Sequence, residues 1–278
     1  TDEQRALLQE AVFFHLGTFY PDSMRKRYNA QLYGEGEKQE TWLVAAATVD
    51  QYLKGKHSQI SKEQIAEIEA LRQQGRIQSV FNAAFFTEGN SRKPEAAGIW
   101  AAVVGSVYLL LIVLACAFPV GVLTAIYLEE YAPDNRFTQI IEVNINNLAA
   151  IPSILYGLLG LAVFINLMGI ERGAPLAGGL TLALRTLPII IISTRAALRA
   201  VPGSIRLAAH SIGATRWQTI LHHLLPLSVP GILTGTIIGL AQAIGETAPL
   251  IIIGMVAFRS SAPEGINAPS TALPAQIF

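Results

Sequence analysis

The sequence of 278 residues contains one cysteine, Cys116, and no excess of either charge, since 20 Lys and Arg balance 20 Asp and Glu. A single cysteine excludes an intrachain disulfide and a metal site built from several cysteines. A net charge of zero argues against nucleic-acid binding, which needs a basic excess to displace counterions from phosphates. The patterns G-x-x-x-x-G-K-[ST], H-E-x-x-H and G-x-S-x-G are also absent, so neither a P-loop nucleotide site nor these two hydrolase signatures is present.

Charged residues are scarce in the second part of the chain. Residues 1–98 hold 25 of the 40 charges, whereas residues 99–278 hold 15, with no lysine after Lys93. A soluble enzyme rarely spreads so few charges over such a length while 51% of the chain is apolar. We therefore expect a membrane protein, and because the first residue is Thr, we expect an internal fragment of a longer chain.

Four long runs contain at most one charge each and exceed the roughly 20 residues that cross about 30 Å of hydrocarbon. We expect transmembrane spans over residues 99–128, 143–170, 173–194 and 227–258. The third run is interrupted by Arg185 and the fourth by Glu246. Pro152, Pro188 and Pro249 are expected to interrupt helices, which membranes tolerate where neighbours satisfy the freed carbonyls.

The distribution of arginines predicts the orientation of these spans. Arg195, Arg199, Arg206 and Arg216 lie between the third and fourth spans without an intervening acid. By the positive-inside rule this loop is cytoplasmic, which places residues 1–98 and the tail outside. The acidic loop from Glu129 to Arg136 does not support the rule. Residues 1–98 are predicted to form a helical extracytoplasmic segment.

The loop over residues 195–226 contains two short helical pieces joined at Gly213. Ala208 and Ala209 lie on the first piece and Trp217 lies on the second. A short helix with arginine and tryptophan but no acid, held at a membrane surface, suits docking into a groove on a partner. An amphipathic helix resting on anionic lipid fits the same residues, and the residues alone leave both interpretations open.

Several segments carry a family resemblance. Leu207-Ala-Ala, Gly213 and Leu225-Pro226 have the spacing of the E-A-A-x-x-x-G-x(9)-I-x-L-P loop of ABC-importer permeases, with Leu207 in place of the glutamate and His223 in place of the isoleucine. The surrounding segments resemble phosphate-transport permeases of the PstA family, in the long form with an extra extracytoplasmic segment. These segments are residues 150–157, 192–198, 230–239 and 244–250.

This resemblance implies an all-α polytopic membrane protein with the type I ABC importer fold. It implies a transmembrane domain over residues 99–278, with the first and last of six family spans missing, in the bacterial inner membrane. The loop 204–225 would be the coupling helix, docking a cytoplasmic ATPase through Ala208, Ala209, Gly213 and Trp217. The partners would be a second homologous permease, two ATPase subunits that bind ATP and magnesium, and a periplasmic phosphate-binding protein. No cofactor is expected on this chain.

Two further groups of residues are candidates for a role within the membrane. A buried charge costs about 2.5–3.5 kcal/mol on insertion scales and is therefore paired or faces a pathway. We expect Arg185 and Glu246 either to line an anion path or to form a structural pair. Gly231, Gly235 and Gly239 recur every four residues and predict a close helix–helix contact.

Three alternatives remain at this level. The same architecture can carry another oxyanion, such as sulfate or molybdate. A membrane-embedded hydrolase would use Glu246 with His222 or His223, although about 34 Å of continuous helix would separate Glu246 from His223. A scaffold without transport activity is the third alternative. A metal site at the adjacent His222 and His223 is not expected, because neighbouring residues point about 100° apart on a helix.

Overall fold

The computed structural model describes residues 47–56, 60, 62–75, 77, 79, 81–91, 97–255 and 258–277, and the regular elements among them are helices. Much of the predicted extracytoplasmic segment, including residues 1–46, lies outside the described residues. The chain divides into two compact units. The first comprises residues 1–102 and 258–262, and the second comprises residues 103–257 and 263–278.

The described part of the first unit contains short helices. They are α3 (Ala47–Leu53), α4 (Lys62–Gln73) and α5 (Ala84–Thr87). The Tyr52 hydroxyl donates a 3.2 Å hydrogen bond to Glu69 Oε1, which joins α3 to α4. The Asn90 N–H donates to the Arg259 carbonyl at 2.8 Å, so residues 258–262 belong to this unit although they come late in the chain.

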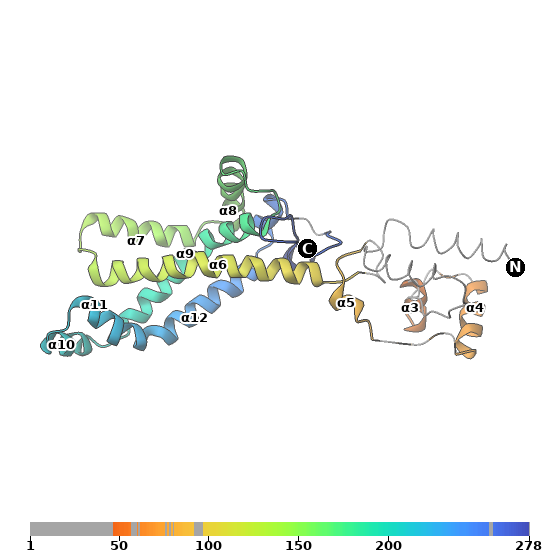
Figure 1. Cartoon of the computed structure of the whole chain (residues 1–278), viewed down its shortest axis with the longest axis horizontal. Helices are drawn as coiled ribbons and strands as arrows, with labels where there is room; N and C mark the ends of the chain where they lie inside the picture. The colour runs from red at the N-terminus through yellow and green to blue at the C-terminus, as the bar shows by residue number, and fades with distance from the viewer. Residues whose placement is uncertain are drawn as a thin grey trace. The chain divides into compact units, whose positions relative to one another are not determined.

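Three helices are long and apolar enough to cross a membrane (Figure 1). The first runs from Trp100 to Tyr131, as α6 (Trp100–Ile126) followed by the π-helical turn η2 (Tyr127–Tyr131). The second is α9 (Pro175–Arg199). The third runs from Arg216 to Ile244, as α11 (Arg216–Thr219), η4 (Ile220–Leu224) and α12 (Leu225–Ile244).

The uncharged run over residues 143–170 does not form one straight helix. It is divided between α7 (Arg136–Ala149) and the helix formed by α8 (Ser153–Gly160) with η3 (Leu161–Leu167), which lie at 101° to each other. Pro152 lacks an N–H, and its ring would clash with the carbonyl of Leu148 in a continuous helix. The Tyr156 hydroxyl donates to that carbonyl at 2.8 Å, so the break leaves it satisfied.

The uncharged run over residues 227–258 is also broken. The helix ends at Ile244, and the short helix α13 (Ala248–Ile252) follows an unwound segment over residues 245–247. Pro249 explains the break, because its ring would clash with the Gly245 carbonyl in a continuous helix. The expectation that Pro188 interrupts its helix is wrong, since Pro188 lies inside α9 and the helix continues to Arg199.

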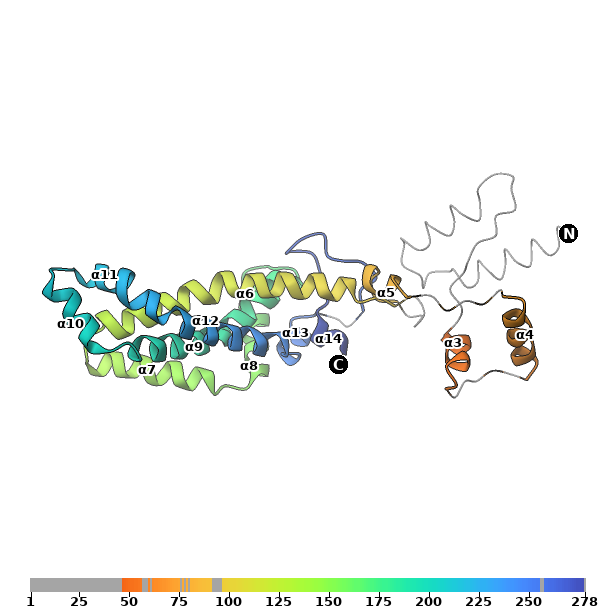
Figure 2. The same ribbon diagram turned by 90° about the horizontal axis from the view of Figure 1, so that it is seen from below.

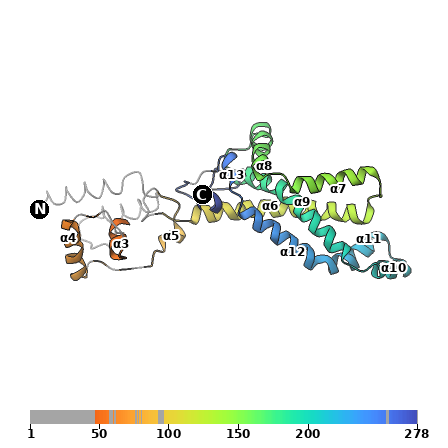
Figure 3. The same ribbon diagram turned by 180° about the vertical axis from the view of Figure 1, so that it is seen from behind.

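Helix α9 lies at the centre of the second unit, between α7 and α12 (Figure 3). Its buried residues include Leu182 and Ile190, which pack with Leu109 and Val113 of α6 and with Leu250 of α13. Alanine and glycine are frequent on the buried side of α9. Small residues allow membrane helices to approach closely, where dispersion forces hold them together.

The glycines of α12 lie against α9. A Cβ atom built on Gly231 would lie 2.7 Å from the Ala197 Cβ, and one built on Gly239 would lie 2.8 Å from Thr186 Cγ2. A Cβ built on Gly235 would clash with the side chain of Ser193. The small-residue ridge read from the sequence therefore faces α9 in the structure.

Substitution of Gly235 by leucine is expected to separate α12 from α9, because four additional carbon atoms cannot fit beside Ser193. Overpacking of this kind destabilises a protein by about 1–3 kcal/mol. The midpoint of thermal unfolding of the purified chain in detergent measures the effect. Ala241→Leu is the matched control, because Ala241 is an exposed small residue of the same helix. Equal midpoints for the two variants would contradict the close contact.

Candidate functional site

Arg185 and Glu246, the two ionisable residues singled out within the apolar runs, form an ion pair. Arg185 Nη2 lies 2.6 Å from Glu246 Oε1, and the two side chains are 22% and 17% exposed. Arg185 comes from the middle of α9, and Glu246 comes from the unwound segment after α12. Each charge is therefore neutralised by the other, which offsets part of the free-energy cost of placing it in an apolar environment.

The ion pair leaves one donor of the arginine without a partner. Arg185 Nη1 is buried and makes no hydrogen bond with the described residues. A guanidinium group has five N–H donors and binds oxyanions through two parallel hydrogen bonds. The structure thus brings the two predicted residues together as a pair and leaves one buried N–H group of Arg185 without a partner among the described residues.

Tyr156 is a neighbour of this pair that the sequence did not indicate. It lies in α8, which packs against α9, the helix that carries Arg185. Its hydroxyl bridges to the Leu148 carbonyl at the end of α7. Tyr156 lies in the segment 150–157 that carries the family resemblance, but its position beside α9 was not predicted because it depends on the contact between α8 and α9. The break between these helices and Arg185 therefore belong to one region of the second unit.

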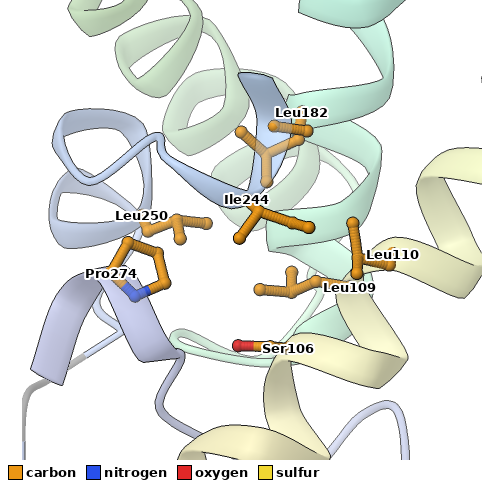
Figure 4. A pocket seen from close by; sticks show the side chains of 8 residues that line it. Ser106, Leu109, Leu110, Leu182, Ile244, Leu250 and Pro274 are labelled. Carbon is orange, nitrogen blue, oxygen red and sulfur yellow. The ribbon is translucent and has the colours of Figure 1, made fainter. Parts of the chain in front are cut away.

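An apolar pocket is lined by residues that lie close in sequence to Arg185 and Glu246, such as Leu182 and Ile244 (Figure 4). Its single hydroxyl, on Ser106, accepts a 2.9 Å hydrogen bond from the Leu273 N–H. The pocket has no charged lining residue and no free polar group, so it is not suited to bind an anion. Its lining residues are Ser106, Leu109, Leu110, Leu182, Ala243, Ile244, Leu250 and Pro274.

The predicted docking loop begins with α10 (Gly203–Ser211), which ends in a glycine turn. The Gly213 N–H donates to the His210 carbonyl at 3.0 Å, and the Ala214 N–H donates to the Ala209 carbonyl at 3.1 Å. These two bonds are those of a Schellman motif, in which the glycine adopts a left-handed conformation. Gly213 has φ +85°, so the turn requires glycine even though the space around it is open.

A capping box starts the second helix of the loop. The Thr215 N–H donates to Gln218 Oε1 at 2.9 Å, and the Gln218 N–H donates to Thr215 Oγ1 at 3.3 Å. These reciprocal bonds satisfy two donors at the start of α11. Figure 2 shows α10 and α11 together at one end of the second unit. Both helix ends of the loop are therefore fixed by local sequence signals.

Large apolar side chains are exposed on the loop. Leu207, Ile212 and Trp217 are 71%, 81% and 53% exposed. Ala208 is exposed beside them, whereas Ala209 is 3% exposed and packs against the rest of the protein. Of the four predicted docking residues, the structure thus places Ala208, Gly213 and Trp217 at the surface and Ala209 in the interior.

Two arginines at the end of α9 form a cluster of ion pairs with Glu129 and Glu142, acids for which the sequence analysis predicted no role. Arg195 lies 3.3 Å from Glu129 and 2.6 Å from Glu142, and Arg199 lies 2.8 Å from Glu129. The acidic loop and the basic loop therefore compensate each other at one end of the second unit. The sequence contained a signal for this pairing. Glu129 and Glu130 directly follow the first apolar run, and Arg195 directly follows the third.

The histidines do not join a chemical site in the structure. His222 and His223 lie on η4, whereas Glu246 follows α12, whose 20 residues span about 30 Å at 1.5 Å per residue. The hydrolase arrangement considered above is thus not formed. Within the described ranges, no three residues of the types His, Cys, Asp and Glu gather as a metal site.

Comparison with known families gives one match that covers more than half of the chain. Residues 117–277 match the family described as binding-protein-dependent transport system inner membrane component. The matched range includes the ion pair Arg185–Glu246, the loop with Gly213 and the cluster around Glu129.

Several curated proteins are similar over the same region. The probable ABC transporter permease protein YqgI of Bacillus subtilis (strain 168) is 35% identical over 168 residues, 60% of this chain and 56% of the relative. The phosphate transport system permease protein PstA of Mycobacterium leprae (strain TN) is 34% identical over 158 residues, 57% of this chain and 51% of the relative. PstA of Yersinia pestis is 35% identical over 173 residues, which are 62% of this chain and 58% of the relative.

The chain spans between about half and three fifths of the length of these curated relatives. Among solved structures, an inward-facing form of the MetNI methionine ABC transporter matches with a TM-score of 0.47 and 22% identity. The match covers 53% of this chain and 71% of that one.

Removal of one partner of the ion pair is expected to destabilise the protein more than removal of both. Arg185→Met or Glu246→Leu leaves an uncompensated charge in an apolar setting and lowers the free energy of unfolding by roughly 3 kcal/mol, whereas the double variant loses less. Unfolding in mixed detergent micelles measures all three. Arg172→Met is the control, because Arg172 is exposed and makes no ion pair with the described residues. Additive losses in the double variant would contradict the pairing.

Proposed function

Because the chain belongs to the family of binding-protein-dependent transport system inner membrane components, we propose that it is the permease subunit of an ATP-driven phosphate importer. It has the all-α transmembrane architecture of that family. The observation that carries the proposal is the family match over residues 117–277, together with relatives at 32–35% identity that are named phosphate transport system permeases. In this function the chain forms part of the anion path and carries out no covalent chemistry.

The ion pair supports an oxyanion as the substrate. A positive charge with an unoccupied donor attracts phosphate, and Arg185 Nη1 is such a donor. Glu246 limits this attraction because it competes for the same guanidinium group. Transport requires binding that is favourable enough for entry and weak enough for release. In our proposal Arg185 attracts the anion and Glu246 helps to release it.

The exposed face of the loop supports docking to a cytoplasmic ATPase. Leu207, Ile212 and Trp217 present apolar side chains, and a tryptophan exposed in this way is typical of the anchor of an interface. The chain lacks a P-loop, so ATP and magnesium belong to the partner in this scheme. The complex would comprise this permease, a second homologous permease, two ATPase subunits and a periplasmic phosphate-binding protein. It would lie in the bacterial inner membrane, with residues 1–98 outside.

Uptake of labelled phosphate by the reconstituted complex tests the proposal. The full-length parent chain is co-expressed with its partners, placed in liposomes and supplied with ATP and binding protein. We expect Gly213→Glu to reduce uptake by roughly tenfold or more, the scale of a lost coupling between sites, because a glutamate at φ +85° distorts the turn of the loop. Co-purification of the ATPase shows whether the complex has assembled.

The matched control is Gly203→Glu, which adds the same carboxylate to an exposed glycine of the loop without a positive φ. Equal losses in both variants would assign the effect to charge rather than to the turn. Sulfate and molybdate are offered in parallel with phosphate. Uptake of sulfate or molybdate but not of phosphate would support the permease function and contradict phosphate as the substrate.

Glu246→Gln tests the role of the ion pair in the path. Without the carboxylate, Arg185 holds the anion more firmly, so both the apparent KM and the maximal rate of uptake are expected to fall together. The kinetics of uptake as a function of loaded binding protein measure both quantities. Unchanged kinetics in an assembled complex would show that Arg185 and Glu246 form a structural pair outside the path.

A further inference from the structure

Glu130, on η2 at the end of α6, binds both helices of the docking loop. Its Oε1 accepts hydrogen bonds from Arg206 Nε at 3.2 Å and Nη2 at 2.9 Å. Its backbone carbonyl accepts a 3.4 Å hydrogen bond from Arg216 Nη1. Arg206 belongs to α10 and Arg216 is the first residue of α11. One residue of the transmembrane helix therefore contacts the loop on both sides of Gly213.

Arg206 extends these contacts to the end of α9. Its Nη2 donates to the Leu198 carbonyl at 3.0 Å, and its Nη1 donates to the Val201 carbonyl at 2.9 Å. The last carbonyls of a helix have no partner within the helix, so a guanidinium group at this position satisfies them and interacts favourably with the helix dipole. Arg206 thus connects α10, the end of α9 and Glu130.

Two adjacent acids of the π-helical turn η2, Glu129 and Glu130, bind different parts of the protein. The Ala132 N–H donates to the Tyr127 carbonyl at 2.8 Å, five residues back, which widens the end of the helix. Glu129 binds Arg195 and Arg199 of α9, whereas Glu130 binds the loop. Turns of this type in α-helices are frequent at functional positions. Here the turn ends the helix with two carboxylates directed to two separate elements.

Apolar packing alone does not fix the orientation of the loop. Ile205 of α10 packs against a cluster of Ile126, Leu198, Ile220 and Leu224. Hydrophobic contact is non-directional, so it allows α10 to slide or rotate on this cluster. Charge-assisted hydrogen bonds have a defined geometry, and those of Glu130 fix the direction of the loop. The Glu130 side chain is 15% exposed, so solvent screens these bonds only in part.

We infer that Glu130 is a positioning residue that transmits motion of the docking loop to α6 and α9. This inference rests on the proposed function. The Glu130 carboxylate binds Arg206, whereas Leu207 and Trp217 are exposed, so loss of the carboxylate removes no side chain from the docking surface. The ATPase then still binds, but its movement is no longer passed to the transmembrane helices. Uncoupling without loss of docking distinguishes this role from a purely structural one.

The experiment compares Glu130→Gln with wild type in the full assembled transporter. We expect the amount of bound ATPase to remain unchanged and the phosphate transported per ATP hydrolysed to fall by about fivefold or more. Glu130→Asp retains the charge but shortens the side chain, and it is expected to give a smaller loss. Asp134→Asn is the matched control, because Asp134 is an exposed acid four residues after Glu130, just past the end of η2, and makes no ion pair with the described residues.

Hydrogen exchange over residues 203–211 gives a second measurement that does not depend on the substrate. Faster exchange in Glu130→Gln than in Asp134→Asn supports the positioning role of Glu130, whether or not the wild-type complex takes up phosphate. Failure of the wild-type complex to take up phosphate would overturn only the proposed function. Exchange and coupling ratio equal to wild type would overturn the positioning role. Loss of bound ATPase in parallel with transport would overturn it as well, because Glu130 would then serve assembly.

Discussion

A charge in an apolar helix must be neutralised by another charge, and the arrangement of the second unit depends on this constraint. Arg185 meets Glu246 across the contact of α9 with the end of α12. Ten residues further along α9, Arg195 meets Glu129 and Glu142 from two other helices. Each pair relieves a desolvation cost that neither partner could bear alone. These pairs therefore join α9 to the segment after α12, to η2 and to α7.

The pairing is possible because helices break at defined positions and approach closely elsewhere. Pro249 ends the helical run after α12, and the unwound segment then carries Glu246 to Arg185. The glycines of α12, such as Gly235, bring this helix against α9 so that the distance between the two charges is short. An additional side chain at that contact would act on the ion pair as well as on packing. The backbone break, the small residues and the two charges thus act together to bring Glu246 to Arg185.

Composition along the chain predicted the apolar segments, and the family resemblance implied the all-helical class. The sequence did not predict which prolines break helices. Pro188 and Pro249 look alike in sequence, yet α9 continues through the first and the helix ends before the second. Whether a freed carbonyl finds a partner depends on how the chain bends, as for Leu148, whose carbonyl accepts from the Tyr156 hydroxyl eight residues later, across the break at Pro152. Local signals such as the turn at Gly213 were readable because their partners lie within a few residues.

Helix α9 contributes residues to both candidate sites, and this gives the second unit a physical route between them. Arg185 and Arg195 are separated by about 15 Å along the helix axis at 1.5 Å per residue. Pro188 lies between them and removes one backbone hydrogen bond from the helix. Small changes of curvature are easiest at such a position. Since Arg206 of α10 also binds the Leu198 carbonyl near the end of α9, a displacement of α10 acts on the same helix whose middle carries the ion pair.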